Sequence, residues 1–524
     1  MCGIAAVHDL SESGSGPPSP ERLDAGRKLG EDMLSRLHHR GPDGHGSTQV
    51  GRTWLGHTRL SIVDLSGGRQ PLADASGRRW VVANGEIYNH EELRGRLPGP
   101  FATDSDSEVV LHVIAALGTP ALRGGIHDMR GMWAFCVADQ DCRVWLGRDP
   151  LGVKPLYWAR HDDRVLAASE LHAFPLHVRP HVEEFPPGHV WTADAGLQQY
   201  VDLHDDPLGS AGPDPSTEDE FPTREAAQAA VRETLATAVR ERMMADVSVG
   251  VFLSGGLDSS VVAAILARES QPGSIVHSFA AGTKGSGDLV AARVVAEALG
   301  LQHHERVYTD EDVVDVLATV VAATESYEPS LVRSAVPNYL LSELAAQHVK
   351  VVLTGEGADE LFAGYHHLRG LDEDALRDAL VDGVQALHHL NLQRCDRVTM
   401  AHGLEARVPF LAREMLAVAQ RVPIGWKLLG EDGQEKRLLR EAFQGWIPDE
   451  ILWRRKEQFG DGSGTADAMN RVVESLVPDA DWSAVRFEGL PPARTREELA
   501  YQRIFAEHLG GINAEQVLGR FATA

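Results

Sequence analysis

Hydrophobic and polar positions follow different patterns in the two halves of the chain. In the first half, apolar residues fall in short strand-like runs that are separated by turn residues, and helical patterns are few. Many short runs of this kind predict strands that are stacked in layered sheets. The clearest runs are Trp54–His57, Trp80–Ala83, Met132–Ala138 and Val144–Leu146.

The second half alternates amphipathic helices with continuous apolar runs. Arg224–Met244 has a helical pattern, whereas Val247–Leu253 and Val349–Leu353 are mostly apolar and typical of buried strands. This alternation predicts a parallel sheet covered by helices, hence an α/β domain after an α+β domain. Between the halves, residues 205–222 are rich in Pro, Gly and acidic residues and have no apolar period. We therefore expect domains at residues 1–204 and 223–524, joined by a linker at 205–222.

Composition and charge narrow the class of protein. The 524 residues are 43% hydrophobic and 24% charged, which is typical of a globular protein with ample core. A formal net charge of -26 argues against a nucleic-acid partner. We see no apolar stretch of membrane-spanning length and no signal peptide, and the four cysteines form no disulfide or zinc pattern. These features predict a cytoplasmic protein that binds no membrane.

Cys2 is the first candidate for chemistry, because it directly follows Met1. Removal of Met1 would leave a residue that carries both a thiol and a free α-amine. The thiolate is the nucleophile, and the amine can take the thiol proton directly or through water. Cys2 alone is better explained as an ordinary second residue, so the hypothesis depends on its surroundings.

Four polar clusters follow Cys2, and each alone could be a turn or a helix cap. The third cluster comes directly after a predicted strand, and the fourth is expected to open a helix with Ser or Asp as its cap. The clusters are Arg40–Gly44, His57–Asp64, Asn84–Asn89 and Thr103–Glu108.

Together with Cys2, these clusters resemble the class II glutamine amidotransferase domain, over roughly residues 1–200. The resemblance implies an N-terminal-nucleophile hydrolase fold, a layered sheet sandwich, in which Cys2 attacks the glutamine amide. It also implies an oxyanion hole made by Asn84 and Gly85, a carboxylate clamp at Arg59, and an α-amine site at Glu86 and Asp106. Leu60, Ile62 and Val63 match positions that lend backbone contacts to glutamine. Segments Asp149–Tyr157 and Ala168–Glu170 continue the resemblance as structural elements.

A glycine-rich loop follows the first apolar strand of the second half. Leu253-Ser254-Gly255-Gly256-Leu257-Asp258-Ser259 leads from that strand into a helical pattern. Backbone N–H groups at such a junction bind phosphates. The absence of a Gly-Lys-Ser/Thr ending excludes the Walker-type loop. A second loop, Thr354–Glu360, also follows an apolar strand.

These loops resemble those of the ATP-pyrophosphatases, which cleave ATP to AMP and pyrophosphate. The resemblance implies Mg²⁺ held by Asp258 and Asp359. It implies adenine over the strand edge His277–Gly282. The residues implied to bind ATP are Leu253, Ser254, Gly255, Gly256, Asp258, Ser259, Ala281, Thr354 and Gly355.

From residue 225 to about 510, the sequence resembles one family, the glutamine-hydrolysing asparagine synthetases. The matching segments are Glu325–Glu328, Arg394–Ala401, Gly403–Leu411 and Leu452–Gly462. By this resemblance Glu356 takes a proton from ammonia and Lys456 stabilises the departing pyrophosphate, although Lys456 could instead be a solvated lysine of a basic run. The chain departs from the family at Pro409-Phe410-Leu411-Ala412, where Asp usually replaces Ala412, and ends at Ala524 without the tail of longer bacterial members.

The resemblance implies that glutamine supplies ammonia to aspartate, which ATP activates as β-aspartyl-AMP, and it suggests a homodimer. An alternative is a relative that amidates another carboxylate, of a specialised metabolite or peptide, with Ala412 as the only hint. Cys2 and Glu356 speak against a β-lactam synthetase, which lacks the Cys and has Tyr in place of Glu356. The intact candidate residues disfavour an inactive scaffold, and the net charge disfavours a tRNA-directed enzyme.

Overall fold

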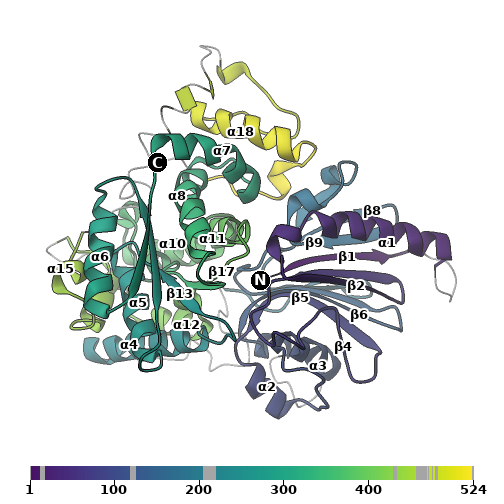
Figure 1. Cartoon of the computed structure of the whole chain (residues 1–524), viewed down its shortest axis with the longest axis horizontal. Helices are drawn as coiled ribbons and strands as arrows, with labels where there is room; N and C mark the ends of the chain where they lie inside the picture. The colour runs from purple at the N-terminus through teal and green to yellow at the C-terminus, as the bar shows by residue number, and fades with distance from the viewer. Residues whose placement is uncertain are drawn as a thin grey trace.

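The computed structural model describes residues 2–11, 18–117, 125–203, 220–428, 433–455 and 482–521, and the single positions 469, 471, 473, 474, 476 and 477. The described residues form two domains that lie side by side (Figure 1). The first ends with strand β12 (Gly196–Gln199), and the second begins with helix α4 (Arg224–Glu241).

Two antiparallel sheets stack face to face in the first domain. The first sheet has the order β10 (Val182–Glu184), β8 (Tyr157–His161), β9 (Arg164–Ala168), β1 (Gly3–Asp9), β3 (Thr53–Arg59) and β2 (Gly44–Val50). The second has the order β12, β11 (His189–Thr192), β7 (Val144–Arg148), β6 (Gly131–Asp139), β5 (Arg79–Ile87) and β4 (Leu72–Ala73). Both sheets contribute apolar side chains to one shared core, including Ile4, Leu55, Val82 and Ala134. This confirms the expected layered sandwich.

Helices cover the outer faces of the sandwich. Helix α1 (Pro20–Ser35) packs on β1 and β3, where Gly30 leaves room for the ring of Trp54. Helices α2 (His90–Arg96) and α3 (Val109–Ala116) pack on the second sheet. Helix α3 has no side-chain cap, so the expected Ser or Asp cap is wrong. Instead, the buried carboxylate of Glu108 accepts hydrogen bonds from the backbone N–H groups of residues 102 and 103.

The second domain has a parallel sheet in the order β15 (Gln302–Val307), β14 (His277–Gly282), β13 (Val249–Phe252), β16 (Val351–Leu353) and β17 (Glu405–Arg407). One face packs against α4, α5 (Leu257–Glu269), α6 (Gly287–Leu299), α12 (Arg413–Arg421), α14 (Arg437–Ala442) and α15 (Asp449–Leu452). The other packs against α7 (Asp310–Thr324), α8 (Pro329–Ala345), α11 (Asn391–Met400) and α18 (Arg496–Leu509). Helix α10 (Glu373–Ala386) and the short helices α9 (Ala358–Leu361) and α13 (Ile424–Lys427) also belong to this domain.

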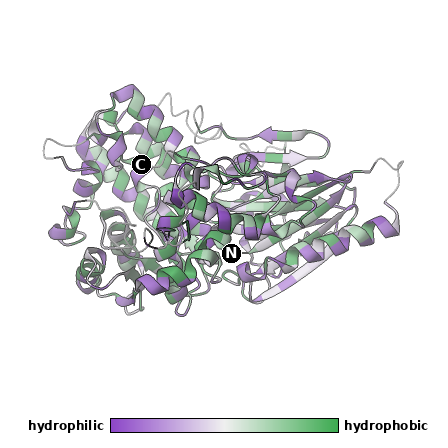
Figure 2. Ribbon diagram, turned by 90° about the horizontal axis from the view of Figure 1, so that it is seen from above, coloured by the Kyte–Doolittle hydropathy of each residue, from purple (hydrophilic) through white to green (hydrophobic). Residues whose placement is uncertain are grey.

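This helix-covered parallel sheet confirms the predicted α/β domain, with shifted boundaries. Helix α4 ends at Glu241 rather than Met244, and β13 begins at Val249 rather than Val247. Hydrophilic and hydrophobic residues alternate along the helices of both domains, as expected where one helix face meets a core (Figure 2). None of the described helices has the length and hydropathy needed to cross a membrane.

The interface between the domains is a buried network of ion pairs. Arg40 of the first domain is fully buried and lies 2.9 Å from Asp396 of α11. Arg397 of the same helix lies 3.4 Å from Glu170 and 3.1 Å from Glu325. Removal of one residue of such a pair leaves the other as an unpaired buried charge, which strongly destabilises the folded protein. The segments 40–44, 168–170 and 394–401, which the sequence marks as family-like, therefore meet at one interface.

Candidate functional site

Cys2 lies immediately before β1 and is buried, with 8% of its surface exposed. Its backbone nitrogen donates a hydrogen bond to Oδ1 of Asn84, 3.1 Å away. Its Sγ lies 4.0 Å from the carbonyl oxygen of Leu60. Burial raises the pKa of the Cys2 thiol, so the thiol carries its proton at neutral pH. A nucleophile in this environment needs a base that removes the proton.

Asn84 and Gly85 lie within strand β5, opposite Ala134 and Trp133 of β6, rather than after a strand as expected. The side chain of Asn84 is fully buried, and its Nδ2 donates no hydrogen bond to any described residue. Gly85 has φ +136°, and a Cβ there would lie 1.9 Å from the Met132 carbonyl oxygen. Only glycine fits here, and Asn84 keeps a free donor beside Cys2.

Arg59, at the end of β3, is buried and holds the loop that follows it. Its guanidinium donates to the carbonyl oxygens of Val63 at 3.3 Å and Asp64 at 2.6 Å. The same loop contains Leu60 and Ile62, whose buried side chains cluster with Val351 and Met400 of the second domain. The loop expected to contact glutamine therefore also docks onto strand β16 and helix α11.

Glu86 and Asp106 are two buried carboxylates of the first domain. Asp106 accepts a hydrogen bond of 2.7 Å from the backbone N–H of Ile87. Burial, and then the charge of Glu405, raise the pKa of Glu86 well above its usual value. Oε1 of Glu86 lies 3.4 Å from Arg407, and Oε2 accepts no hydrogen bond from the described residues. A buried polar atom of this kind is costly without a partner, and a ligand amino group would supply one.

The second site begins with the loop between β13 and α5. Gly255 has φ +72°, and a Cβ there would lie 2.5 Å from the backbone of α6. The hydroxyls of Ser254 and Ser259 lie 3.2 Å apart, and Ser254 Oγ accepts from the N–H of Gly256 at 3.3 Å. The loop therefore opens onto the N-terminus of α5, where backbone N–H groups favour a phosphate.

Leu253 and Ala281 are buried apolar residues on opposite sides of the sheet. Leu253, 1% exposed, packs with the α5 side, whereas Ala281, 4% exposed, packs with the α8 side. The backbone N–H of Leu253 donates to Phe279 on β14. Because both side chains are inside the core, we infer that these two residues would meet a nucleotide through their main chain.

The loop after β16 touches the loop after β13. A Cβ on Gly355 would lie 2.9 Å from the nitrogen of Ser259 in the first turn of α5, so this loop packs closely against the start of the helix that follows β13. The backbone N–H of Thr354 donates to the carbonyl oxygen of Arg407, which fixes the loop to β17. The carboxylate of Glu356 forms an ion pair with Arg394 of α11.

Lys436 joins the two loops, and the sequence reasoning missed it. Its Nζ lies 2.6 Å from Oδ2 of Asp258 and 2.6 Å from Oδ1 of Asp359. The lysine has φ +53° and its side chain is 2% exposed. Gly364 makes the arrangement possible, because a Cβ there would lie 1.8 Å from the Asp359 carboxylate. No local pattern marks this lysine, since its partners are about 80 and 180 positions away.

The donor set of Asp258 and Asp359 fits a hard divalent cation. Both carboxylates converge on one point, and carboxylate oxygens are the ligands that Mg²⁺ prefers. In the structure Lys436 supplies the positive charge at that point. Lys456, which was expected to act on pyrophosphate, lies outside the described residues. Arg454, two positions before it, donates to the carbonyl oxygen of Gly255 and pairs with Asp288.

Ala412 directly follows Leu411, whose side chain lies against Gly357 in the loop after β16. It is the N-cap of α12 and borders a cavity of about 220 Å³ whose walls include Arg130, Glu241 and Glu414. An Asp at this position would be a helix cap, which is a structural role. Loss of this cap is one structural consequence of Ala412, and the proposed link to another acceptor substrate stays a prediction.

Two family models match the chain. The glutamine amidotransferase domain matches residues 1–186, and asparagine synthase matches residues 230–372 and 369–520. A probable glutamine-hydrolysing asparagine synthetase of Schizosaccharomyces pombe is 37% identical over 97% of this chain and 93% of its own length. The asparagine synthetase B of Escherichia coli is 35% identical over 97% and 91%, and the enzyme of Sandersonia aurantiaca is 37% identical over 96% of both chains. The chain belongs to the family of glutamine-hydrolysing asparagine synthetases.

Proposed function

We propose that this protein makes asparagine from aspartate and ATP, with glutamine as the nitrogen donor. The products are asparagine, glutamate, AMP and pyrophosphate. Glutamine reacts beside Cys2, and ATP and aspartate react between the loops that carry Asp258 and Asp359. The proposal assigns one half of the reaction to each domain.

In the first half, Cys2 Sγ attacks the side-chain amide carbon of glutamine. Once Met1 has been removed, the Cys2 nitrogen is the α-amine that takes the thiol proton. This nitrogen is already oriented by its hydrogen bond to Asn84 Oδ1. The free Nδ2 of Asn84 and the backbone at Gly85 are suited to stabilise the oxyanion. Ammonia leaves with the proton, and water then hydrolyses the γ-glutamyl thioester to glutamate.

Glutamine is held by charged groups at its α-carbon end. Arg59 would bind the α-carboxylate, while Glu86 and Asp106 would bind the α-ammonium, with backbone contacts from Leu60, Ile62 and Val63. The unsatisfied Oε2 of Glu86 supports this assignment. An ammonium beside it would also favour the ionised carboxylate, whose pKa burial raises.

In the second half, the β-carboxylate of aspartate attacks the α-phosphorus of ATP, and pyrophosphate leaves. The loop at Ser254–Ser259 would bind the phosphates through backbone N–H groups and serine hydroxyls. Lys436, and Lys456 by resemblance, would neutralise charge on the pyrophosphate. Ammonia then attacks the acyl carbon, Glu356 accepts a proton, and AMP departs. Arg394 fixes the position of the Glu356 carboxylate for this step.

Asp258 and Asp359 would also hold Mg²⁺ when ATP binds. The ion supplies charge neutralisation for the phosphates. For both aspartates to face the ion, the Lys436 ammonium would move toward the phosphate oxygens. The flexible four-carbon side chain of lysine allows this change.

One observation carries the proposal most directly. The Cys2 nitrogen bonds to the oxygen of the Asn84 amide, and the nitrogen of the same amide is buried without a partner among the described residues. A structural asparagine would be expected to use both ends of its amide. A free donor beside a nucleophile is instead what an oxyanion hole requires.

The test is a product assay with aspartate, ATP and Mg²⁺, fed with either glutamine or ammonium chloride. We expect asparagine and AMP in equal amounts from both nitrogen sources. The variant Cys2→Ala should lose glutamine use and keep ammonia use, while Cys142→Ala, which lies outside the site, should keep both.

The alternative outcomes are distinct. Loss of both activities in Cys2→Ala, with the fold intact, would contradict separate sites. Glutamine hydrolysis without aspartate-dependent AMP would contradict aspartate as the acceptor and favour another carboxylate. Mass spectrometry of the intact chain shows whether Met1 has been removed, which the mechanism requires. Sedimentation of the same sample tests the homodimer that the resemblance suggests.

A further inference from the structure

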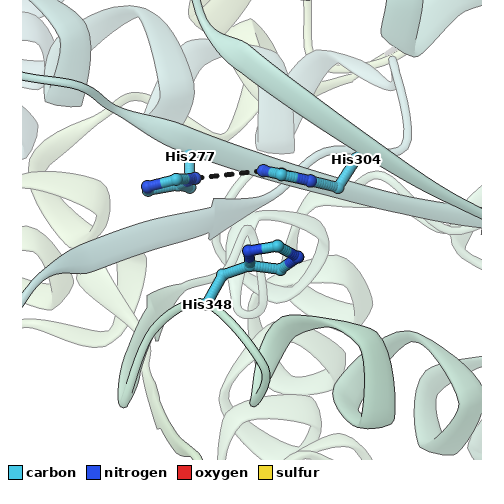
Figure 3. Close-up of side chains that lie close together, drawn as sticks. All are labelled: His277, His304 and His348. Atoms are coloured by element: carbon cyan, nitrogen blue, oxygen red, sulfur yellow. Dashed lines mark hydrogen bonds between the residues drawn. The ribbon is translucent and has the colours of Figure 1, made fainter.

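Three histidines from separate segments meet on one face of the parallel sheet (Figure 3). His277 is the first residue of β14, and His304 lies on the neighbouring strand β15. His348 comes from the turn between α8 and β16. Nδ1 of His277 and Nε2 of His304 are 3.0 Å apart. One ring nitrogen from each histidine lies within 4.8 Å of those from the other two.

These separations are close to those of a metal site. Imidazole nitrogens bind Zn²⁺ at about 2.0–2.1 Å in a tetrahedral arrangement, which places ligand atoms about 3.3 Å from each other. The His277 and His304 nitrogens already approach that spacing. The His348 ring is tilted by 30° relative to that of His304, with 4.0 Å between centroids. It is exposed and sits on a turn, so a rotation of its side chain would complete the set.

One side of the three rings faces an apolar side chain. The fully buried ring of Phe279 lies against all three, 5.2–6.3 Å between centroids, and Gly250 on β13 makes room for it. The nearby carboxylate of Glu305 is turned to the other side of the strand, where it pairs with Arg293 and His303. Such a shell fixes ring orientation and limits access of water from one side.

Two other histidine-containing clusters are less suited to a metal ion, because their carboxylates are already paired with arginines. His39 and His172 lie beside Glu170, and His388 and His389 lie beside Glu184. Glu170 is already paired with Arg40 and Arg397, and Glu184 is paired with Arg148. A dication in either cluster would face a buried guanidinium, which is unfavourable. Among the described residues, no ion pair places a cationic side chain beside His277, His304 and His348.

We propose that His277, His304 and His348 form a site for a divalent late transition metal ion, of which Zn²⁺ is the example. Three neutral imidazoles would bind the ion, and water would occupy the fourth position. The site lies where β14 begins, whereas the phosphate loops follow the opposite ends of β13 and β16. Its effect would be structural, because the ion would link β14, β15 and the turn before β16.

The experiment uses the full chain, freed of metal with a chelator and dialysed. Zn²⁺ is titrated by calorimetry, and Co²⁺ binding is followed by its visible ligand-field absorption. We expect one equivalent of each ion to bind, and Zn²⁺ to raise the thermal midpoint of unfolding. The variants His348→Gln and His304→Gln should each lower Zn²⁺ affinity by at least about tenfold, since each removes a ligand.

Two control variants separate this site from general histidine binding. His303→Gln changes the adjacent residue on the opposite face, where His303 contacts Ser278. His389→Gln removes a member of a competing cluster. Both should keep the affinity and the Co²⁺ spectrum of the parent chain. Equal affinity in His348→Gln and the parent would overturn the proposal, as would loss of the Co²⁺ spectrum in His389→Gln alone. His348 is on an exposed turn, so its replacement tests the site even if His304→Gln misfolds.

Discussion

Glu86 of the first domain lies 3.4 Å from Arg407 of the second, and both side chains are buried. Arg407 also pairs with Glu405 at 2.5 Å and donates to the carbonyl oxygens of Arg242 and Met244. Its own carbonyl oxygen accepts from Thr354, at the start of the loop that carries Glu356. A group proposed to bind glutamine is thus two residue contacts away from the synthetase loop. This pair offers a physical connection between the two reactions.

Replacing Arg407 with Met should strongly destabilise the protein. Burial raises the pKa of Glu405, but nearby positive charges, of which Arg407 is the largest contributor, outweigh burial and lower this pKa to about 2. Without Arg407, Glu405 would lose its ion-pair partner in a buried position. Loss of one partner of a buried pair costs about 3–5 kcal/mol. The double variant Glu405→Gln/Arg407→Met removes both charges and should recover part of that loss. The midpoints of urea denaturation, followed by tryptophan fluorescence, compare the stabilities of the variants. A double variant that is no more stable than Arg407→Met would contradict the idea that the unpaired Glu405 charge causes the loss.

The interface between the domains should weaken at alkaline pH through His172. Burial opposes its charged form, but the hydrogen bond and charge of Glu325 outweigh burial and raise the pKa of His172 to about 9. Because the folded pKa is raised above the ordinary 6.5, the stabilisation is complete below pH 6.5 and is lost as pH rises through 9. The imidazole is 30% exposed, so solvent screening reduces the effect to about 1–2 kcal/mol.

The measurement for His172 is the thermal midpoint between pH 6 and 10, at about 0.1 M salt. The parent chain should lose more stability over this range than His172→Gln, and the difference between them isolates this residue. Parallel curves for the two proteins would show that His172 does not contribute.

Lys436→Met should greatly slow the synthetase reaction and spare the glutaminase reaction. The two aspartates would lose the ammonium between them, and the departing pyrophosphate would lose a fixed cation. Loss of one such stabilising group costs about 10²–10³ in rate. Pyrophosphate release reports the synthetase reaction, and glutamate formation reports the glutaminase reaction. Arg437→Gln, the adjacent surface residue that pairs with Glu441, is the matched control and should retain both.

Gly364→Ala should have the same selective effect for a steric reason. The added Cβ would lie 1.8 Å from the Asp359 carboxylate and 2.1 Å from Cε of Lys436. Both side chains would have to move, so the Asp258–Lys436–Asp359 arrangement would be lost. Gly370→Ala is a useful comparison, because that glycine has open space around it although its φ is +84°. Normal pyrophosphate release from Gly364→Ala would refute the need for this arrangement.

Local patterns in the sequence predicted most of the fold, because the relevant signals are short. The apolar runs became β3, β5, β6 and β7, and the switch to helix–strand alternation marked the parallel sheet. The ends of the strands could not be predicted from local patterns alone. Asn84 and Gly85 continue β5 because β6 pairs with them as far as Gly131, a tertiary contact that local propensity does not contain.

Motifs located the loops of the candidate sites but not the residues that connect them. Cys2, Asn84, Asp258 and Glu356 stand in recognisable segments. Lys436 does not, because its position between two aspartates depends on the packing of three distant segments. The pairing of Glu86 with Arg407 is hidden for the same reason, since 321 positions separate them and no periodicity links the two domains.

Ala412 offers a test of whether a family departure is structural or concerns substrate choice. The residue is the N-cap of α12, with φ -64° and ψ 139°, and it provides no side-chain hydrogen bond. A serine hydroxyl at this position could accept from a backbone N–H of the first turn, so Ala412→Ser should stabilise the protein by about 1 kcal/mol. Ala412→Val adds volume without a hydrogen-bond acceptor and should not stabilise the protein.

Ala412→Asp should gain less than Ala412→Ser. The carboxylate would cap the helix, but it would also enter the cavity that Glu233, Glu241 and Glu414 share with Arg130. Burial already raises the pKa of Glu241, so a further negative charge there is unfavourable. Thermal midpoints rank the three variants, and the KM for aspartate should stay unchanged in all of them. A changed preference among carboxylate substrates in Ala412→Asp would instead place this position in acceptor selection, through a movement of α12 that the cap controls.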